Sequence, residues 1–494
     1  MRGILDAIDD HARLFPEKIA YHLSSGAPVS DNNQGDNQLT YQQLITYANK
    51  LAFYLQEALK DDHSPLVVFG HKSPWMLICF LACVKSGRAY CPIDVSVPVE
   101  RVRDIIIQAA SPLVFALAEL KVVPAESVTI TAAEVMAICT GMTAEIDGTH
   151  RVGRDDVFYI IFTSGSSGTP KGVKITTDCL ENFVRWAVTL GDLERIVESP
   201  TIINQAPLSF DLSVMDLYLS LYLGGTIWAV DRDTQDNMRR LLESLGQSAA
   251  DVWVSTPSFA NICLSDPLFS SALLPKLKLF LFCGERLTNN TVARLQARFP
   301  DAGIINTYGP TESTVAVTSV LITRELNAQV SPLPVGRPKL GTTILIMDQE
   351  GRILPDGEKG EIVIVGDTVS TGYLNRDDLT EKSFFYHLLE GKYQRAYRTG
   401  DAGYLLGNYL YFCDRIDRQI KMHGYRIEIG DVESNLLKLE EVESAVVLPV
   451  FKDDQVNSLT AWVVPRFQID DHFGAAQSLR KKLMSLLPVY MIPK

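Results

Sequence analysis

Short apolar runs alternate with helix-like stretches along most of this sequence, and that alternation restricts the fold more than any other feature. Such runs have the length and composition of buried strands, as in FYIIFTS (158–164), DVWVSTP (251–257), LKLFLFCGE (277–285) and GIINTYG (303–309). Buried strands separated by helices favour an α/β fold with parallel strands. Beyond about Pro334 the strand-like runs are separated by glycines, which indicates a smaller β subdomain.

The chain has 494 residues, which is too many for one compact core because single cores stop growing at roughly 250–300 residues. We therefore expect a large N-terminal domain over residues 1–416, which holds the α/β sheets and the small β subdomain. From about Arg415 the pattern changes to strand, helix, strand, strand. This change predicts a small α+β domain over residues 417–494.

Charge and cysteine usage narrow the possible partners and compartment. The formal net charge of −13 disfavours nucleic acid as a partner, because phosphate binding needs an excess of Lys and Arg. The longest apolar window, PWMLICFLACV (74–84), is about half of the ~20 residues that a membrane span needs, so we expect no membrane embedding. None of the eight cysteines forms a CxxC pair, which leaves a zinc ribbon or redox motif unsupported. Scattered cysteines suit a reducing compartment, and a cytoplasmic location is expected.

A loop rich in Gly, Ser and Thr follows the strand-like run 158–164 and precedes a second one, KGVKIT (171–176), so we expect it to link two strands. Its glycines allow close approach of the backbone to a ligand, and successive N–H groups in such a loop can bind an anion. It is not a Walker-type P-loop, because Pro170 precedes Lys171 and Gly172 follows it. A turn without function is the alternative. The residues predicted to contact the anion are Thr163, Ser164, Gly165, Ser166, Ser167, Gly168, Thr169 and Lys171.

The segment NTYGPTEST (306–314) places Glu312 beside several hydroxyl groups after a Gly–Pro turn. Mg²⁺ takes one or two carboxylates together with phosphate oxygens, so a carboxylate in a protein with an anion-binding loop suggests a magnesium ligand. The aromatic ring of Tyr308 is suited to stacking on a base. The alternative for this segment is the capped start of a helix.

Two isolated aspartates admit both a structural and a functional interpretation. Asp211 lies in the apolar run LSFDLSVMDLY (208–218), where an unpaired acid is costly. It is either the N-cap of a helix or the partner of a ligand ammonium group. Asp401, in YRTGDAG (397–403), is either a turn residue or a carboxylate that accepts hydrogen bonds from a diol.

Together these segments resemble the adenylate-forming superfamily, which includes acyl-CoA synthetases, luciferases and the adenylation domains of nonribosomal peptide synthetases. The resemblance covers nearly the whole chain and implies that the anion is the triphosphate of ATP and that Glu312 binds Mg²⁺. It implies a mobile C-terminal domain, with Asp417 as the hinge and KMHGYRIEIGDVE (421–433) entering the site in one orientation. Asp414 stands where the family usually has glycine. Beyond the loop, the resemblance assigns ATP binding to Asn306, Thr307, Tyr308, Thr311, Asp401 and Arg415.

The segments NQAPLSFDLSVMDLY (204–218) and FLFCGERL (280–287) look most like those of members that activate D-alanine in the teichoic acid pathway. In those members an aspartate matching Asp211 holds the substrate ammonium group. Cys283 is implied to exclude one enantiomer by contact near the α-carbon, and its alternative is a buried cysteine at a strand end. The substrate-binding residues implied by the resemblance are Asp211, Cys283, Gly309 and Val315.

The resemblance implies chemistry in two steps. The carboxylate of D-alanine attacks the α-phosphate of ATP, and the phosphopantetheine thiol of a D-alanyl carrier protein then attacks the acyl group of D-alanyl-AMP. No protein nucleophile is required, so catalysis depends on positioning and charge stabilisation. A monomer is expected. Five basic residues near the hinge are either a solvated face or part of a surface for an acidic carrier: Arg415, Arg418, Lys421, His423 and Arg426.

The sequence ends at Lys494, before the C-terminal lysine that the family uses in adenylate formation. No catalytic residue is therefore assigned, and the C-terminal domain is expected to be incomplete. This polypeptide is expected to be more impaired in adenylate formation than in thiol transfer. Three alternatives stay open: an adenylation domain for glycine, L-alanine or L-serine, a nucleotide-binding protein without turnover, and a generic phosphate-binding module.

Overall fold

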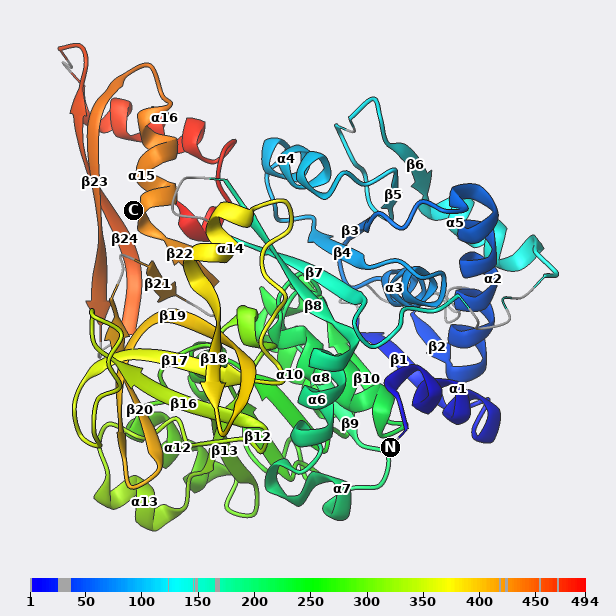
Figure 1. The fold of residues 1–494 in the computed structure, drawn as a ribbon, viewed down its shortest axis with the longest axis horizontal. Coiled ribbons are helices and arrows are strands. Elements are labelled where there is room, and N and C mark those ends of the chain that lie inside the picture. Colours follow the sequence, from blue (N-terminus) through cyan, green and yellow to red (C-terminus); the bar gives the residue numbers. More distant parts are fainter. Residues whose placement is uncertain are drawn as a thin grey trace.

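A computed structural model describes residues 2–24, 37–122, 124–144, 146, 150–164, 169–416, 419–422, 425–452, 455–468 and 471–494, without the side chains of residues 452 and 455. Within these ranges the chain forms two helix-covered sheets, a smaller antiparallel sheet and a C-terminal unit of hairpins and helices (Figure 1). The predicted α/β class, with a small β subdomain and a C-terminal α+β unit, is confirmed.

The largest sheet of the described residues has the strand order β15-β14-β13-β12-β11-β9-β10-β1-β2. Neighbours from β13 through to β1 pair in parallel, whereas β2, β14 and β15 are antiparallel to their neighbours. Parallel strands are covered on both faces, which explains their continuous apolar sequences. The bounds are β1 (Ile19–Ser24), β2 (Gln38–Thr40), β9 (Thr201–Asn204), β10 (Thr226–Val230), β11 (Val252–Ser255), β12 (Leu279–Phe282), β13 (Gly303–Tyr308), β14 (Thr318–Leu321) and β15 (Arg337–Pro338).

A second sheet has the order β6-β5-β3-β4-β7-β8. Its strands β3 to β7 pair in parallel, and β8 returns antiparallel to β7 with Lys171 opposite Thr163. This hairpin confirms that the Gly- and Ser-rich loop links two strands. The bounds are β3 (Leu66–Gly70), β4 (Tyr90–Asp94), β5 (Leu113–Ala116), β6 (Val128–Thr131), β7 (Val157–Thr163) and β8 (Lys171–Thr176).

Helices of the N-terminal part cover these sheets and share their core. One buried cluster contains side chains from β1, β3, β7 and β12 together with those of α3 and α8. Both helices are apolar nearly all round, as expected for helices enclosed on every side. The bounds are α1 (Ile4–Leu14), α2 (Tyr41–Leu59), α3 (Pro74–Lys85), α4 (Val99–Ala109), α5 (Ala132–Gly141), α6 (Thr177–Ala187), α7 (Leu193–Ile196), α8 (Leu212–Tyr222), α9 (Arg232–Gln235), α10 (Met238–Ser248), α11 (Pro257–Leu264), α12 (Asn289–Arg298), α13 (Arg324–Gln329) and α14 (Asp377–Ser383).

The small sheet predicted beyond Pro334 is antiparallel throughout. Its strands turn at Gly- and Asn-containing loops, and its inner face packs on the end of the large sheet through a cluster that includes Tyr308. The bounds are β16 (Thr342–Met347), β17 (Gly360–Gly366), β18 (Phe384–Leu389), β19 (Lys392–Leu406) and β20 (Tyr409–Arg415).

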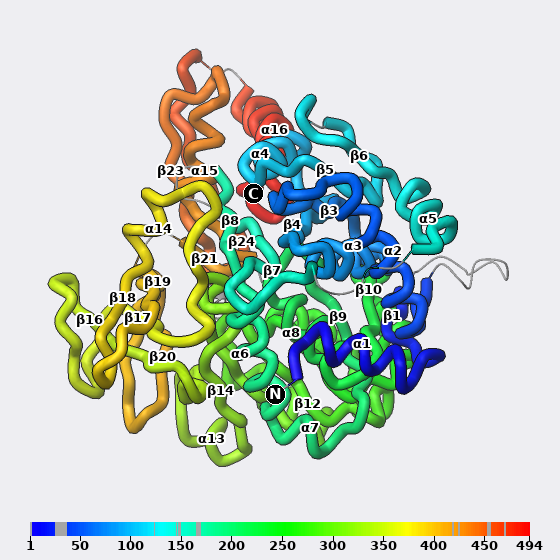
Figure 2. Tube along the Cα trace, turned by 45° about the vertical axis from the view of Figure 1, so that its right-hand side comes forward, coloured from blue at the N-terminus to red at the C-terminus, as the bar shows by residue number. Residues whose placement is uncertain are grey.

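The C-terminal unit has its own core, formed by the helices, the hairpins and the final turn. Its first predicted strand is in fact a hairpin of two antiparallel strands, in which Met422 lies opposite Tyr425. Both views place this unit beside α4 at the upper end of the second sheet (Figures 1 and 2). The bounds are β21 (Gln419–Met422), β22 (Tyr425–Glu428), α15 (Ile429–Leu437), β23 (Val442–Lys452), β24 (Gln455–Pro465) and α16 (His472–Leu483).

Candidate active site

A cavity lies where the parallel strands of the large sheet end. β9, β11, β12 and β13 are parallel neighbours, so their carboxyl ends meet at one edge, which is where ligands bind in open α/β sheets. The segments after these ends bring Asp211, Thr256, Cys283 and Gly309 to the cavity wall, and β7 brings Thr163 from the other sheet. Residues predicted from separate motifs therefore meet at one place.

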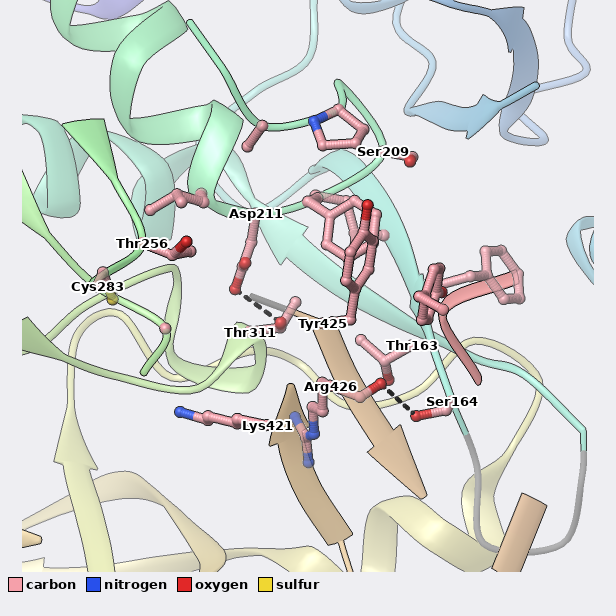
Figure 3. Close-up of a pocket in the computed structure, with 18 of the residues that line it drawn as sticks. Thr163, Ser164, Ser209, Asp211, Thr256, Cys283, Thr311, Lys421, Tyr425 and Arg426 are labelled. Carbon is pink, nitrogen blue, oxygen red and sulfur yellow. Dashed lines mark hydrogen bonds between the residues drawn. The ribbon is translucent and has the colours of Figure 1, made fainter. Parts of the chain in front are cut away.

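Asp211 points into this cavity rather than capping a helix. It occupies the N-cap position of α8, but its side chain makes no capping hydrogen bond. The hydroxyl of Thr311 instead donates to Oδ2 of Asp211 over 2.7 Å (Figure 3). Burial raises the pKa of Asp211, although the Thr311 hydrogen bond and the charges of Lys421 and Arg426 act in the opposite direction. The geometry favours a ligand-binding carboxylate over the N-cap interpretation.

Cys283 and Val315 close the cavity near Asp211. The Cys283 thiol is buried and donates a weak hydrogen bond to the carbonyl of Val315 over 3.6 Å. Burial raises the pKa of this thiol, so it stays neutral and acts as a small wall group rather than a nucleophile. Thr314 and Val315 both have left-handed backbone torsions, with φ of 63° and 66°, which are strained for β-branched residues. A Cβ at Gly309 would lie 2.5 Å from the Cα of Ala316, so only glycine fits there.

The described ends of the Gly- and Ser-rich loop carry polar groups toward the cavity. The buried hydroxyl of Thr163 has no hydrogen-bond partner among the described residues, and that of Ser164 donates to the carbonyl of Arg426 over 3.0 Å. Thr169 is exposed. Lys171 is largely buried, and its Nζ lies 3.4 Å from Oε1 of Glu312. Burial lowers the pKa of Lys171, although the nearby Glu312 charge raises it. The predicted residues Gly165, Ser166, Ser167 and Gly168 lie outside the described part of the chain.

Glu312 is fully buried and is surrounded by donors. Nη1 of Arg426 lies 2.7 Å from its Oε2, and the hydroxyl of Tyr373 donates to its Oε1 over 2.8 Å. Burial alone raises the pKa of a carboxyl group, but the charges of Arg426 and Lys171 outweigh burial and hold the pKa of Glu312 well below its usual range. Glu312 is therefore an ionised carboxylate, and it lies in a short 3₁₀ turn rather than at the start of a long helix.

Tyr308, Asp401 and Arg415 form one hydrogen-bonded group. Asp401 lies opposite Arg415 in the β19–β20 pair and accepts from its Nη1 over 2.7 Å. The hydroxyl of Tyr308 donates to the other carboxylate oxygen. The β19–β20 pairing explains why Asp401 is more than a turn residue. The side chains of Asn306 and Thr307 donate to the carbonyls of Pro334 and Phe282 over 2.8 Å each.

The hairpin β21–β22 inserts three side chains at this place (Figure 3). Lys421 and Arg426 line the cavity with Tyr425, and Nζ of Lys421 lies 5.8 Å from the ring centroid of Tyr308. Tyr425 stacks on Tyr490 at a ring distance of 3.7 Å and meets Phe210 edge-on at 5.1 Å. The C-terminal unit thus closes one side of the cavity.

Sequence reasoning did not identify Arg426 and Tyr373 as partners of Glu312. The segment HGYRIE could have indicated Arg426, because the resemblance placed this segment in the site in one orientation of the C-terminal domain. Of the five basic residues considered as a solvated face or carrier surface, Arg415, Lys421 and Arg426 turn inward. The other two, Arg418 and His423, and the predicted hinge Asp417 lie outside the described residues.

No group of three or more His, Cys, Asp or Glu side chains in the described ranges is arranged to hold a metal ion. Among the described residues, no helix is long and apolar enough to cross a membrane.

Comparisons with known proteins give a consistent result. Residues 8–374 match the family described as AMP-binding enzyme. The chain is 46% identical over 461 residues to a D-alanine–D-alanyl carrier protein ligase of Bacillus cytotoxicus, covering 93% of this chain and 90% of the relative. It is 45% identical over 469 residues, with the same coverage, to the ligase of that name from Bacillus cereus strain G9842. An artificially fused adenylation–PCP di-domain from Klebsiella oxytoca is 20% identical, with a TM-score of 0.84 over 100% of this chain and 93% of that chain, and supports the fold alone.

Proposed function

This chain belongs to the AMP-binding enzyme family, and from that premise we propose that it activates D-alanine with ATP and transfers it to the phosphopantetheine thiol of a D-alanyl carrier protein. The protein is an AMP-forming ligase. The observation that carries the choice of substrate is Asp211, a partly exposed carboxylate held by Thr311 in a small pocket. A carboxylate in that position can pair with the ammonium group of an amino acid. A substrate without an ammonium group would leave the carboxylate without this partner.

In the proposed substrate site, Asp211 holds the ammonium group of D-alanine. Charge-assisted hydrogen bonds of this kind contribute about 1.5–3 kcal/mol. Cys283, Gly309 and Val315 surround the α-carbon and its methyl group. The thiol and the turn at Val315 are both buried, which supports selection of a small side chain in one configuration.

In the proposed nucleotide site, the triphosphate of ATP lies against the β7–β8 loop and Lys171. The orphaned hydroxyl of Thr163 fits this assignment, because a buried polar atom without a protein partner is typical of a ligand contact. Asp401 and Arg415 are proposed to hold the ribose, and Tyr308 the adenine. The assignment includes the remaining residues predicted for this ligand: Ser164, Gly165, Ser166, Ser167, Gly168, Thr169, Asn306, Thr307 and Thr311.

Glu312 is proposed to bind Mg²⁺. The residues fit this ion, because a buried, ionised carboxylate beside a phosphate-binding loop supplies the single protein oxygen that Mg²⁺ commonly uses with phosphate ligands. When bound, the ion neutralises charge on the phosphates. In the present arrangement the guanidinium of Arg426 occupies the same carboxylate. Arg426 and a metal ion are therefore alternative partners of Glu312.

We propose that residues 1–416 and 417–494 are separate domains that hinge at Asp417. In the first step a carboxylate oxygen of D-alanine attacks the α-phosphorus and pyrophosphate leaves. In the second step the thiol loses its proton, its sulfur attacks the carbonyl carbon, and AMP leaves. The arrangement seen here suits the second step for two reasons. The β21–β22 hairpin covers the site, and Arg426 pairs with Glu312, which is not required to hold Mg²⁺ once pyrophosphate has left.

The substrates are D-alanine, ATP and the carrier protein, and the enzyme is proposed to act as a cytoplasmic monomer. All eight cysteines are free, which suits a reducing compartment.

Amino-acid-dependent pyrophosphate exchange tests the function. D-alanine is expected to support exchange at least about tenfold better than L-alanine, glycine or L-serine, because the pocket wall discriminates by one group. Loading of a holo carrier protein, followed by mass spectrometry, tests the second step. Preference for another amino acid would assign the chain to that substrate instead. ATP binding without exchange, together with no loading of the carrier protein from supplied D-alanyl-AMP, would favour a nucleotide-binding protein without turnover.

Replacing Cys283 by alanine is expected to lower the preference for D-alanine over L-alanine by about tenfold, because it opens space where the wrong methyl group would clash. The measurement is kcat/KM in pyrophosphate exchange for both enantiomers. Cys263→Ala is the matched control, since Cys263 is equally buried but lies in α11 outside the cavity wall. An unchanged ratio in Cys283→Ala would remove Cys283 from the selectivity mechanism.

A further inference from the structure

An ion pair joins the N-terminal part to the C-terminal unit beside the cavity, whose wall includes Arg101. Nη1 of Arg101, in α4, lies 2.8 Å from Oδ2 of Asp431, in the first turn of α15. The side chain of Asp431 is fully buried, and that of Arg101 is 11% exposed. The two residues are 330 positions apart, so the pair exists only because the two parts of the chain are docked in this arrangement.

The Asp431 carboxylate has a donor on each oxygen. Nη1 of Arg101 donates to Oδ2, and Nδ2 of Asn435 donates to Oδ1 over 2.8 Å. Asn435 belongs to the same helix as Asp431 and stays with it in any orientation of the C-terminal unit. Arg101 is therefore the partner that depends on how the two parts of the chain are docked.

The free-energy cost of losing Arg101 depends on whether Asp431 stays buried. If Arg101 is removed while the docking persists, a buried carboxylate loses its counter-charge, which is strongly unfavourable. If the C-terminal unit rotates away, the same carboxylate reaches water and the penalty disappears. Loss of Arg101 therefore shifts the orientation equilibrium away from the arrangement seen here.

We propose that Arg101 and Asp431 are a positioning pair that holds the C-terminal unit in the thiol-transfer orientation. This inference rests on the proposed function, because it assigns the docked arrangement to the second step. The pair acts through the placement of β22, whose Tyr425 and Arg426 close the cavity. The edge-on contact of Tyr425 with Phe210 joins the two parts of the chain in the same arrangement.

The test separates the two steps in four variants: Arg101→Gln, Arg101→Lys, Asp431→Asn and the Arg101→Gln/Asp431→Asn double variant. Transfer is measured by rapid mixing of enzyme and supplied D-alanyl-AMP with holo carrier protein, and the first step by pyrophosphate exchange. Arg101→Gln is expected to slow transfer about tenfold or more while exchange stays within about twofold. Arg103→Gln is the matched control, since Arg103 is an exposed arginine of the same helix.

The ranking of variants distinguishes positioning from a general loss of structure. Arg101→Lys keeps the charge and is expected to lie between wild type and Arg101→Gln. The double variant is expected to transfer faster than Arg101→Gln, because it no longer buries an unpaired carboxylate. Unchanged transfer in Arg101→Gln, or a parallel fall in exchange and thermal stability, would overturn the pair's role. Failure of every form of the protein, the unsubstituted chain included, to transfer the acyl group from supplied D-alanyl-AMP would instead count against the proposed function.

Discussion

Replacing Asp211 by asparagine is expected to weaken binding of a D-alanyl-adenylate analogue by about 100-fold. The substitution keeps the size of the side chain and its contact with Thr311, but it leaves the ligand ammonium group without a counter-charge in a partly buried site. Removal of one partner from such a pair costs about 3 kcal/mol or more, and each 1.4 kcal/mol is tenfold in affinity. The measurement is calorimetric titration with D-alanyl-sulfamoyl adenosine, which does not react.

A ligand without the amine provides the control for this prediction. The propionyl analogue has no ammonium group, so Asp211→Asn and the unsubstituted protein are expected to bind it within about twofold of each other. Thr311→Val removes only the donor to Asp211 and is expected to have a smaller effect, because a single hydrogen bond contributes about 1 kcal/mol. Equal weakening for both ligands would mean that Asp211 shapes the pocket and does not hold the amine.

The same carboxylate predicts how binding depends on pH. Burial raises the pKa of Asp211 above its ordinary value of about 3.9, so its charge is lost at a higher pH than for an exposed aspartate. Affinity for the amine-bearing analogue is expected to be full above the raised pKa and to fall as the pH drops through it. In Asp211→Asn the affinity is expected to be flat over that range. A fall of the same size in the variant would assign the titration to another group.

Replacing Glu312 by glutamine is expected to lower pyrophosphate exchange by about 1000-fold. The change removes the carboxylate proposed for Mg²⁺ and leaves the largely buried Lys171 without its counter-charge. Breaking a buried pair in this way costs about 3–5 kcal/mol. The measurement is exchange as a function of Mg²⁺ concentration, and the variant is expected to need more Mg²⁺ for half-maximal activity.

Two further variants test whether the loss of exchange in Glu312→Gln comes from the lost charge at this position. Glu312→Asp keeps the charge on a shorter side chain and is expected to retain more activity than Glu312→Gln. Glu361→Gln is the matched control, because Glu361 is also ion-paired, to Arg398 over 2.7 Å, but lies in β17 of the small sheet. An unaltered Mg²⁺ requirement in Glu312→Gln would exclude Glu312 as a metal ligand.

Several features of the fold were determined by the sequence alone. The buried strands, the loop between β7 and β8 and the small glycine-separated sheet follow from patterns within a few residues of each other. Local backbone preferences and apolar periodicity decide such elements, so one sequence is enough to predict them. The resemblance added the family, which the match over residues 8–374 confirms.

Only the tertiary structure decided which side chains meet. The structure identifies Asp211 as a cavity carboxylate and not an N-cap, because Thr311, 100 residues later, donates to it. Glu312 meets Arg426 across 114 residues, and Arg101 meets Asp431 across 330. Such contacts depend on the order of strands in the sheets and on how the C-terminal unit docks. Neither is encoded in local spacing, and a buried charge is stable only where the whole fold brings a partner to it.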